Sequence, residues 1–205
     1  MTTAPENPSG FDAIFGDRRV MAILRGMPPG QTVELAQRAW DLGIEQVEVP
    51  VQTPDALPSL AAAVAAARER GRDIGAGTVT TVEQVRAVAA AGAVFTVAPG
   101  FDPAVAAASA AAGLPHLPGV ATPTEVQQAV RHGLSWLKMF PATALGTAWF
   151  SAMRGPFPAV RLVATGGVDA RNAAEYFAAG ARVVAVGSAL ADPEQLDLLA
   201  PLVRA

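Results

Sequence analysis

Short apolar runs rich in β-branched residues alternate with longer Ala-rich stretches along almost the whole chain. Runs of the first kind, such as Gln46–Val51, have the length and composition of buried strands. Stretches of the second kind, such as Asp55–Arg70, are typical of amphipathic helices. Regular alternation of strand and helix predicts parallel strands joined by crossover helices.

The pattern predicts eight strands, at Val20–Leu24, Gln46–Val51, Ile74–Thr78, Val94–Ala98, His116–Gly119, Trp136–Phe140, Arg161–Thr165 and Val183–Gly187. It predicts eight helices, at Thr32–Leu42, Asp55–Arg70, Val82–Ala91, Pro103–Ala112, Pro123–Arg131, Thr143–Arg154, Ala170–Ala179 and Pro193–Val203. Eight short units of similar size favour an α/β fold of the (β/α)8 TIM-barrel type. The alternative is an open doubly wound sheet. That fold normally carries GxGxxG after its first strand, where this chain has LRGMPPG.

The length of 205 residues fits one domain. Residues 1–10 are polar and are expected to be a disordered tail, while residues 11–205 are expected to form the barrel and its catalytic site. Within this domain, residues 11–19 are expected to form a short helix that closes the bottom of the barrel.

Composition excludes several classes of function. The net charge is −3, so no basic field favours nucleic acid as a partner. No apolar run reaches the roughly 18 residues that a membrane span needs, and the N-terminus lacks the apolar core of a signal peptide. A cytoplasmic location is therefore expected. The chain has no cysteine and two histidines, which argues against thiol chemistry and a His-rich metal centre.

Lys138, within WLKMFP, carries the strongest chemical signal. It is the only lysine in the chain and lies inside an apolar strand, with Trp136 and Phe140 on the same face. Lysine is rarely buried unless it is paired or functional. Burial disfavours the ammonium form, and the neutral amine is the form that attacks a carbonyl carbon. The alternative is a salt bridge, or an ammonium group that reaches water at the strand end.

Two more charged side chains are expected to face the barrel interior near strand ends. Alternation along QVEVPV places Glu48 opposite the outward valines, and alternation along AILRG places Arg25 with Met21 and Ile23. An inward carboxylate near a reactive amine can transfer protons through water. An inward guanidinium can grip a substrate carboxylate with two hydrogen bonds. The alternative is a structural ion pair of Glu48 with Arg25 or Lys138.

Glycine-rich strand ends indicate an anion site. Thr78 closes GAGT, where its hydroxyl and nearby amides could meet the substrate carboxylate; a simple tight turn is the alternative. The segments TGG and VGS end the last two strands, whose loops commonly bind phosphate in this fold. His116 opens a strand and His132 ends a helix, and neither is expected to act in catalysis.

Taken in order, these segments resemble those of the bacterial 2-keto-3-deoxy-6-phosphogluconate (KDPG) aldolases, which often also cleave 4-hydroxy-2-oxoglutarate. The matching segments are AILRG, VEVPVQTP, GAGTV, APG, LPGVATPTE, LKMFPA, TGGV and VGS. The resemblance implies a homotrimeric (β/α)8 barrel and a class I lyase that works without a metal or other cofactor. The substrate would be a phosphorylated 2-keto-3-deoxy sugar acid, cleaved to pyruvate and glyceraldehyde 3-phosphate.

The resemblance also implies a role for individual residues. Lys138 would form the Schiff base, and Glu48 would act as the general acid and base through water. Arg25 and Thr78 would hold the pyruvyl carboxylate. The other implied substrate contacts are the pocket-lining Pro99 and Phe140, the hydroxyl of Thr165 near the substrate hydroxyls, and a phosphate cradle of Gly166, Gly167, Gly187 and Ser188.

Two departures leave the substrate open. Many gluconate-type members have an arginine where this chain has Gln52, which weakens the argument for a phosphate. EVPVQTP also resembles the phosphogalactonate branch, whereas Thr165 favours the gluconate branch. The alternatives are therefore the galactonate epimer or 4-hydroxy-2-oxoglutarate. More distant alternatives are a phosphosugar isomerase or epimerase on the same barrel, and a phosphosugar-binding protein without activity; neither needs a Schiff base.

Overall fold

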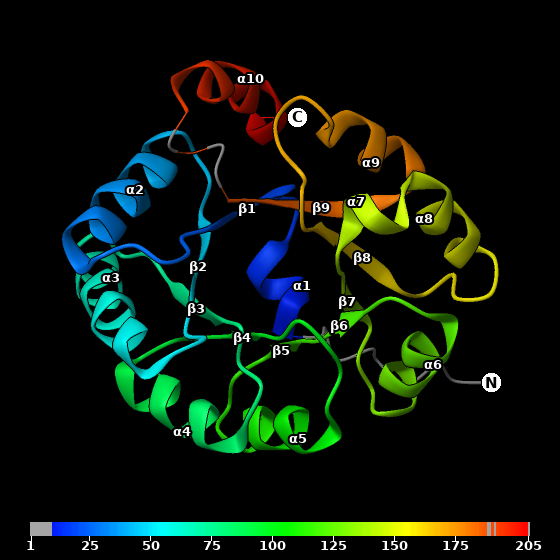
Figure 1. Cartoon of the computed structure of the whole chain (residues 1–205), viewed down its shortest axis with the longest axis horizontal. Helices are drawn as coiled ribbons and strands as arrows, with labels where there is room; N and C mark the ends of the chain where they lie inside the picture. Colours follow the sequence, from blue (N-terminus) through cyan, green and yellow to red (C-terminus); the bar gives the residue numbers. More distant parts are fainter. Residues whose placement is uncertain (1–9, 188–189, 191, 205) are drawn as a thin grey trace.

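The computed structural model describes residues 10–187, 190 and 192–204. They fold into a barrel of parallel strands inside a ring of helices (Figure 1). The sheet order is β5-β4-β3-β2-β1-β9-β8-β7-β6, so strands that follow one another in sequence are neighbours in space. The strands are β1 (Val20–Ile23), β2 (Gln46–Pro50), β3 (Ile74–Gly77), β4 (Thr96–Val97), β5 (His116–Leu117), β6 (Gly119–Val120), β7 (Trp136–Met139), β8 (Arg161–Thr165) and β9 (Ala181–Val186).

The outer helices follow the strands around the ring, and α1 lies in its centre (Figure 1). The helices are α1 (Gly10–Phe15), α2 (Pro29–Asp41), the 3-10 helix η1 (Pro54–Ala56), α3 (Leu57–Glu69), α4 (Val82–Ala91), α5 (Pro103–Ala111), α6 (Pro123–Arg131), α7 (Ala142–Leu145), α8 (Thr147–Arg154), α9 (Ala173–Ala179) and α10 (Pro193–Arg204). The predicted (β/α)8 architecture is confirmed. The helix α1 begins at Gly10, one residue inside the segment expected to be a tail; the rest of that segment lies outside the described residues.

One predicted strand, His116–Gly119, is divided in two by Pro118. β5 pairs with β4, whereas β6 pairs with β7, so this stretch of chain joins the two edges of the sheet. Proline has no N–H to donate, but the Pro118 carbonyl accepts a hydrogen bond from the Lys138 N–H at 2.8 Å. The two short strands therefore occupy one strand position in the barrel.

The helix predicted at Ala170–Ala179 begins later, at Ala173. The Asp169 carboxylate accepts hydrogen bonds from the N–H groups of Arg171 and Asn172, at 2.8 and 3.2 Å. These bonds close a turn before the helix, so Asn172 and not Asp169 is its N-cap. In the same way Gly146, with φ of 78°, divides the predicted helix Thr143–Arg154 into α7 and α8.

The core has two parts, divided by the barrel wall. Outward side chains such as Val47 and Val49 pack against the helices, as predicted from alternation. Inward side chains such as Met21 and Trp136 pack with Phe11 and Phe15 of α1. The Phe15 and Trp136 ring centroids are 4.8 Å apart. The helix α1 therefore closes the bottom of the barrel, where the strands begin.

His116 faces outward, toward α5, in a small buried polar cluster. Its Nδ1 lies 2.8 Å from the Thr96 hydroxyl oxygen, which in turn lies 3.0 Å from that of Ser109. Burial lowers the pKa of His116 from 6.5 to about 4, although Asp102 opposes the shift. This histidine is therefore neutral in the folded protein at pH 7.

We expect the free energy of unfolding to fall as the pH drops from 6.5 toward 4, because the unfolded chain then takes up a proton on His116 before the folded chain does. The loss from this group is about 3 kcal/mol. Urea unfolding across this pH range should show a smaller decline for His116→Gln. The control for a histidine-to-glutamine change at the surface is His132→Gln on the exposed end of α6. Equal slopes for His116→Gln and the wild type would contradict the assignment.

Candidate active site

Lys138 lies inside the barrel on β7 and is only 1% exposed. Its backbone pairs with Gly119 on β6 and Val163 on β8, so it sits in the continuous wall of the barrel. Trp136 fills the interior below it. The Nζ atom lies 5.0 Å from the centroid of the Phe140 ring, one residue beyond the strand end. The side chain therefore points inward, as alternation predicts, and not into the helical shell.

The surroundings of Lys138 favour its neutral form. Burial lowers the pKa of the Lys138 amine, and the positive charge of Arg25 lowers it further, whereas the Glu48 carboxylate opposes both effects. An amine that loses its proton more easily has its lone pair free for attack on a carbonyl carbon. This is the electrostatic setting that a Schiff-base lysine requires.

Glu48 lies on β2 and is completely buried. Neither of its carboxylate oxygens has a hydrogen-bond partner among the described residues. Burial raises the pKa of this carboxyl group, while Lys138 and Arg25 act to lower it. A buried carboxylate is costly unless it is paired or functional, so Glu48 is a candidate for proton transfer as well as for an ion pair with Lys138 or Arg25.

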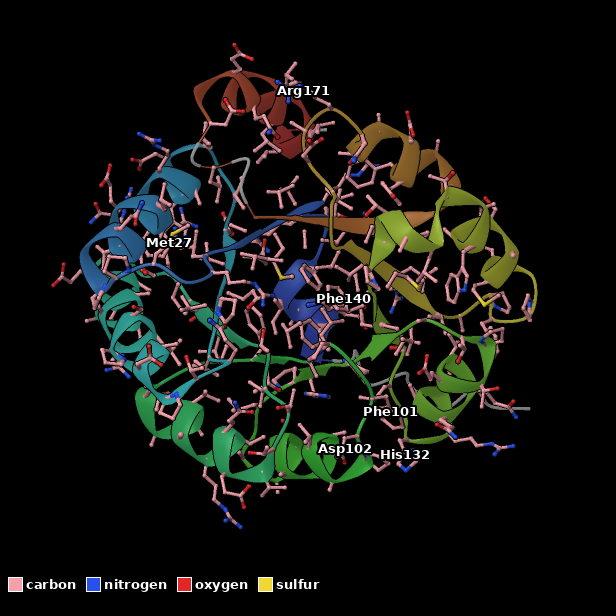
Figure 2. The ribbon with its side chains drawn as sticks, viewed as in Figure 1. Met27, Phe101, Asp102, His132, Phe140 and Arg171 are labelled. Atoms are coloured by element: carbon pink, nitrogen blue, oxygen red, sulfur yellow. The ribbon has the colours of Figure 1, made fainter. Side chains whose placement is uncertain are left out.

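A cavity of about 530 Å³ opens at the carboxyl ends of the strands, and its lining includes neighbours of Lys138 and Glu48 but not these two residues themselves. Its floor includes Ile23, the register partner of Glu48. The Phe140 side chain, near the middle of the ring of strands in Figure 2, also lines it. The cavity is lined by Ile23, Arg25, Met27, Phe140, Thr165, Gly166, Gly167, Val168, Asp169, Ala185 and Gly187. This is the end of the barrel where active sites of the fold occur.

Several predicted substrate contacts meet in this cavity. Arg25 follows β1 and is exposed, so its guanidinium is open to a ligand. Thr165, at the end of β8, is 2% exposed, and its hydroxyl oxygen has no partner among the described residues. Gly166 and Gly167 follow it with φ of 97° and 76°, a region that glycine enters without strain.

Thr78 and Pro99 stand apart from this group. They follow β3 and β4 at the same end of the barrel, but the cavity wall does not include them. Among the described residues, Thr78 is the non-glycine residue with a positive φ, which is 56°. This backbone conformation costs energy and is often found at functional sites. Gly187 lines the cavity, and Ser188 lies outside the described residues.

The sequence did not single out Met27 or Asp169 as cavity residues. Met27 lies in the loop after β1, where strand alternation no longer tells the direction of a side chain (Figure 2). Asp169 directly precedes the predicted helix Ala170–Ala179, a position where a carboxylate commonly accepts backbone hydrogen bonds, so its sequence context did not indicate that it also lines the cavity. Its carboxylate adds negative charge at the glycine-rich side of the cavity.

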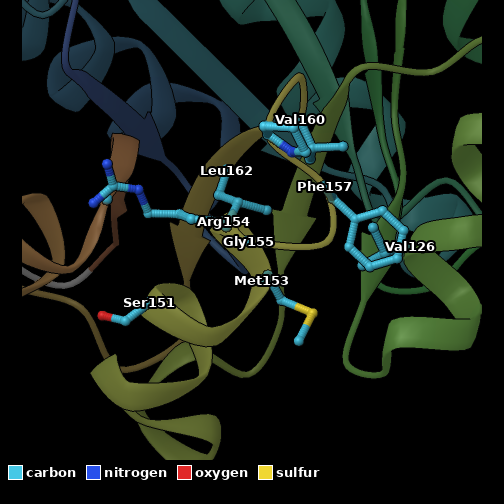
Figure 3. A pocket seen from close by; sticks show the side chains of 10 residues that line it. Val126, Ser151, Met153, Arg154, Gly155, Phe157, Val160 and Leu162 are labelled. Carbon is cyan, nitrogen blue, oxygen red and sulfur yellow. The ribbon is translucent and has the colours of Figure 1, made fainter.

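Two other hollows lie away from the carboxyl ends of the strands. One, of about 410 Å³, lies on the outer surface among α6, α8 and β8, where Phe157, Met153 and Arg154 contribute to its wall (Figure 3). The second, of about 470 Å³, lies near the strand N-termini. Across the described part of the chain, no group of three His, Asp or Glu side chains could hold a metal ion, and no helix is long and apolar enough to span a membrane.

A parallel barrel with a buried amine, a buried carboxylate and a mouth rich in glycine defines the class of lysine-dependent barrel enzymes. A family model described as KDPG and KHG aldolase matches residues 11–199. The chain belongs to this aldolase family, which confirms the resemblance read from the sequence. It is therefore a lyase of class I, which acts on a carbon–carbon bond.

Relatives carry both epimeric substrate names. The chain is 45% identical over 180 residues to the 2-dehydro-3-deoxy-phosphogluconate aldolase of Treponema pallidum (strain Nichols), covering 86% of this chain and 83% of that one. It is 39% identical over 178 residues to a probable 2-dehydro-3-deoxy-6-phosphogalactonate aldolase of Rhizobium meliloti (strain 1021), with 86% and 84% covered. A solved KDPG aldolase from Legionella pneumophila, with pyruvate captured as a covalent carbinolamine, is 30% identical with a TM-score of 0.80, covering 93% of this chain and 95% of that one.

Proposed function

We propose that this chain cleaves 2-keto-3-deoxy-6-phosphogluconate to pyruvate and glyceraldehyde 3-phosphate, through a Schiff base on Lys138. The observation that carries the proposal is that Lys138 and Glu48 are both buried inside the barrel, next to Phe140 and Ile23, which line the cavity at its open end. The gluconate-type relative at 45% identity supports this substrate. The carbinolamine in the Legionella pneumophila enzyme supports a covalent bond between pyruvate and the lysine of this chain.

The first half of the reaction forms the iminium. The neutral Lys138 amine attacks the keto carbon at position two and gives a carbinolamine. Glu48, with its raised pKa, donates a proton to the departing hydroxyl group, which leaves as water. The nitrogen then carries a positive charge that can accept an electron pair from the neighbouring carbon chain.

The second half breaks the carbon–carbon bond. Removal of the proton from the hydroxyl at carbon four sends the electron pair of the bond between carbons three and four toward the iminium. Glyceraldehyde 3-phosphate leaves, and an enamine stays on Lys138. Protonation of the enamine and hydrolysis of the resulting iminium release pyruvate, with Glu48 as the proton carrier.

The substrate ends would be held at opposite sides of the mouth. Arg25 would grip the carboxylate, because its guanidinium opens into the cavity and matches a carboxylate with two hydrogen bonds. The Thr78 hydroxyl would add a donor, and Pro99 and Phe140 would border the pyruvyl group. The roles proposed for Thr78 and Pro99 require the substrate to extend beyond the residues that line the cavity.

The phosphate would lie against the backbone amides of Gly166, Gly167 and Gly187, and of Ser188, which follows β9. Glycine loops after the last two strands can donate several N–H groups to one anion. The exposed Gln52 contributes no charge, and Asp169 lines the same cavity. We therefore infer that neutral backbone N–H groups bind the phosphate and that the Asp169 carboxylate partly repels it. The affinity for phosphate should then be lower than at a site with a cationic side chain.

The galactonate epimer is the second candidate substrate, favoured by the probable phosphogalactonate aldolase among the relatives. The two sugar acids differ at one stereocentre, and the unpartnered Thr165 hydroxyl is available to a substrate hydroxyl. Parallel kcat/KM measurements on the two epimers and on 4-hydroxy-2-oxoglutarate would rank the three substrates. We infer that the gluconate epimer ranks first.

Incubation with pyruvate and borohydride, followed by mass spectrometry, tests the covalent step. We expect one pyruvate-derived adduct per chain, on the peptide that contains Lys138, because the reduced iminium cannot hydrolyse. The chain has no other lysine, so the α-amino group is the remaining amine that could react. Lys138→Arg is the matched control and should give no adduct. Full turnover without any adduct would contradict the aldolase proposal and favour an isomerase or epimerase.

We also infer a homotrimer, as the family resemblance implies, and a cytoplasmic location, as expected from the sequence. The designed cage among the structural matches, built by fusing symmetric oligomeric domains, is 31% identical to this chain and supports an oligomer without setting its size. Light scattering after gel filtration would give the number of subunits.

A further inference from the structure

Strand β3, Ile-Gly-Ala-Gly, has two glycines on the face that points into the barrel. Ile74 and Ala76 alternate with them and pack outward toward the helices. Glycine weakens a strand because it has no side chain to pack and is more flexible in the unfolded chain. Two inward glycines in one four-residue strand therefore call for a reason in the packing of the barrel.

Each glycine leaves room for a side chain from a neighbouring strand. A Cβ atom built on Gly75 would overlap the ring of Phe95, which comes from the β4 side. A Cβ atom built on Gly77 would lie 2.7 Å from Oε1 of Glu48, and closer still to Oε2 and Cδ. The Glu48 carboxylate thus occupies the space where a side chain of residue 77 would be.

The backbone gives no other reason for glycine at position 77. Gly166 and Gly167 have positive φ, which disfavours other residues, but Gly77 does not belong to the positive-φ residues of the described chain. Its conformation is that of an ordinary strand residue, paired with Pro50 on β2. The three heavy atoms nearest to a Cβ atom at position 77 all belong to the Glu48 side chain.

The strand register shows in which direction the carboxylate leans. Glu48 pairs with Gly75, and Gly77 is two residues farther along β3 toward the mouth. At a rise of about 3.3 Å per residue, that is roughly 7 Å along the strand. The Glu48 side chain therefore extends toward the cavity, and it does so across the face of Gly77.

From this geometry we infer that Gly77 is a positioning residue: its missing side chain is what allows the Glu48 carboxylate to lie toward the mouth of the barrel, on the side where the substrate enters. Any side chain at position 77 would turn the carboxylate away from this place. The inference rests on the proposed function for its effect on catalysis, but the steric relation between the two residues does not depend on it.

Gly77→Ala tests the inference directly. We expect kcat to fall roughly 10²-fold, the size of a lost general acid or base, with a smaller change in KM. Shortening the displaced side chain should relieve the overlap, so Gly77→Ala/Glu48→Asp should turn over at least about fivefold faster than Gly77→Ala. Glu48→Asp alone should be slower than the wild type. A double variant that is no faster than Gly77→Ala would overturn the inference.

Gly75→Ala is the matched control, because the same change on the same strand meets Phe95 and not Glu48. We expect its effect on kcat to be the same with Glu48 or with Glu48→Asp present. Rescue of Gly75→Ala by Glu48→Asp, to the extent seen for Gly77→Ala, would show a general loosening of the barrel and would overturn the specific coupling.

Stability measurements keep the inference testable if Gly77→Ala folds poorly. In the Glu48→Ala background the space is empty, so Gly77→Ala should cost little unfolding free energy there and much more in the wild type. Equal costs in both backgrounds would overturn the steric relation. If the stability coupling holds while Glu48→Asp and Glu48→Gln keep full activity, it is the catalytic role of Glu48 in the proposed function that fails.

Discussion

Lys138→Met should lower kcat at least about 10⁴-fold, because the covalent route through the iminium is lost. Methionine has a similar length and suits a buried site, so the variant should fold. Lys138→Arg should lose as much activity, since a guanidinium keeps its proton at all working pH values and cannot act as the nucleophile. Coupled assay of pyruvate release, with circular dichroism to check folding, measures both effects.

The two variants together separate an enzyme from a binding protein. If turnover survived within about tenfold in either one, catalysis would not depend on a lysine Schiff base. If the wild type had no activity, and if Lys138→Arg bound the sugar acid as tightly as the wild type, the chain would be a phosphosugar-binding protein.

Glu48→Gln should lower kcat by about 10²- to 10⁴-fold, because an amide has the shape of the carboxyl group but cannot carry the proton. The borohydride adduct on Lys138 should still form, only more slowly. The free energy of unfolding, in contrast, should be higher for Glu48→Gln than for the wild type above pH 4.5. Since the pKa of Glu48 is raised from 4.5, the folded wild type loses stability as the pH rises above that value, and Glu48→Gln does not.

The matched control for this change is Glu45→Gln. Glu45 precedes β2 at the closed end of the barrel, where it pairs with Arg18 and, at 2.9 Å, with Arg72. It should leave kcat unchanged. If the two variants had the same kcat, or if the stability advantage of Glu48→Gln did not grow from pH 5 to pH 8, the assignment of Glu48 would be wrong.

Most of the fold followed from periodicity. Strand Arg161–Thr165 and helices Val82–Ala91 and Pro123–Arg131 have the predicted bounds, because caps or turns define their ends. The helix caps Thr81 and Thr122 each make a capping box, which is a local interaction and so visible in sequence. The division at Pro118 was not predicted, because it depends on which neighbour each half pairs with.

The inward direction of Lys138 and Glu48 was predictable for a simple reason. Both lie inside strands, where alternation fixes the side-chain direction. Arg25, Thr78 and Pro99 come one or two residues after strand ends, where loops set the direction. Arg25 reaches the cavity, and Thr78 and Pro99 do not line its wall. The overlap at Gly77 was hidden in the sequence, because it joins residues on different strands.

The helix α1 closes one end of the barrel, and the cavity opens at the other end. Its aromatic side chains close the floor, so reactants and products share the passage past Phe140. In the proposed reaction the aldehyde fragment would lie nearer this opening, while the three-carbon remnant would still be bound to the Lys138 amine deeper inside. The proposal therefore predicts sequential release, with the phosphorylated aldehyde first and pyruvate last, and an excess of pyruvate would hold the enzyme in its covalent form.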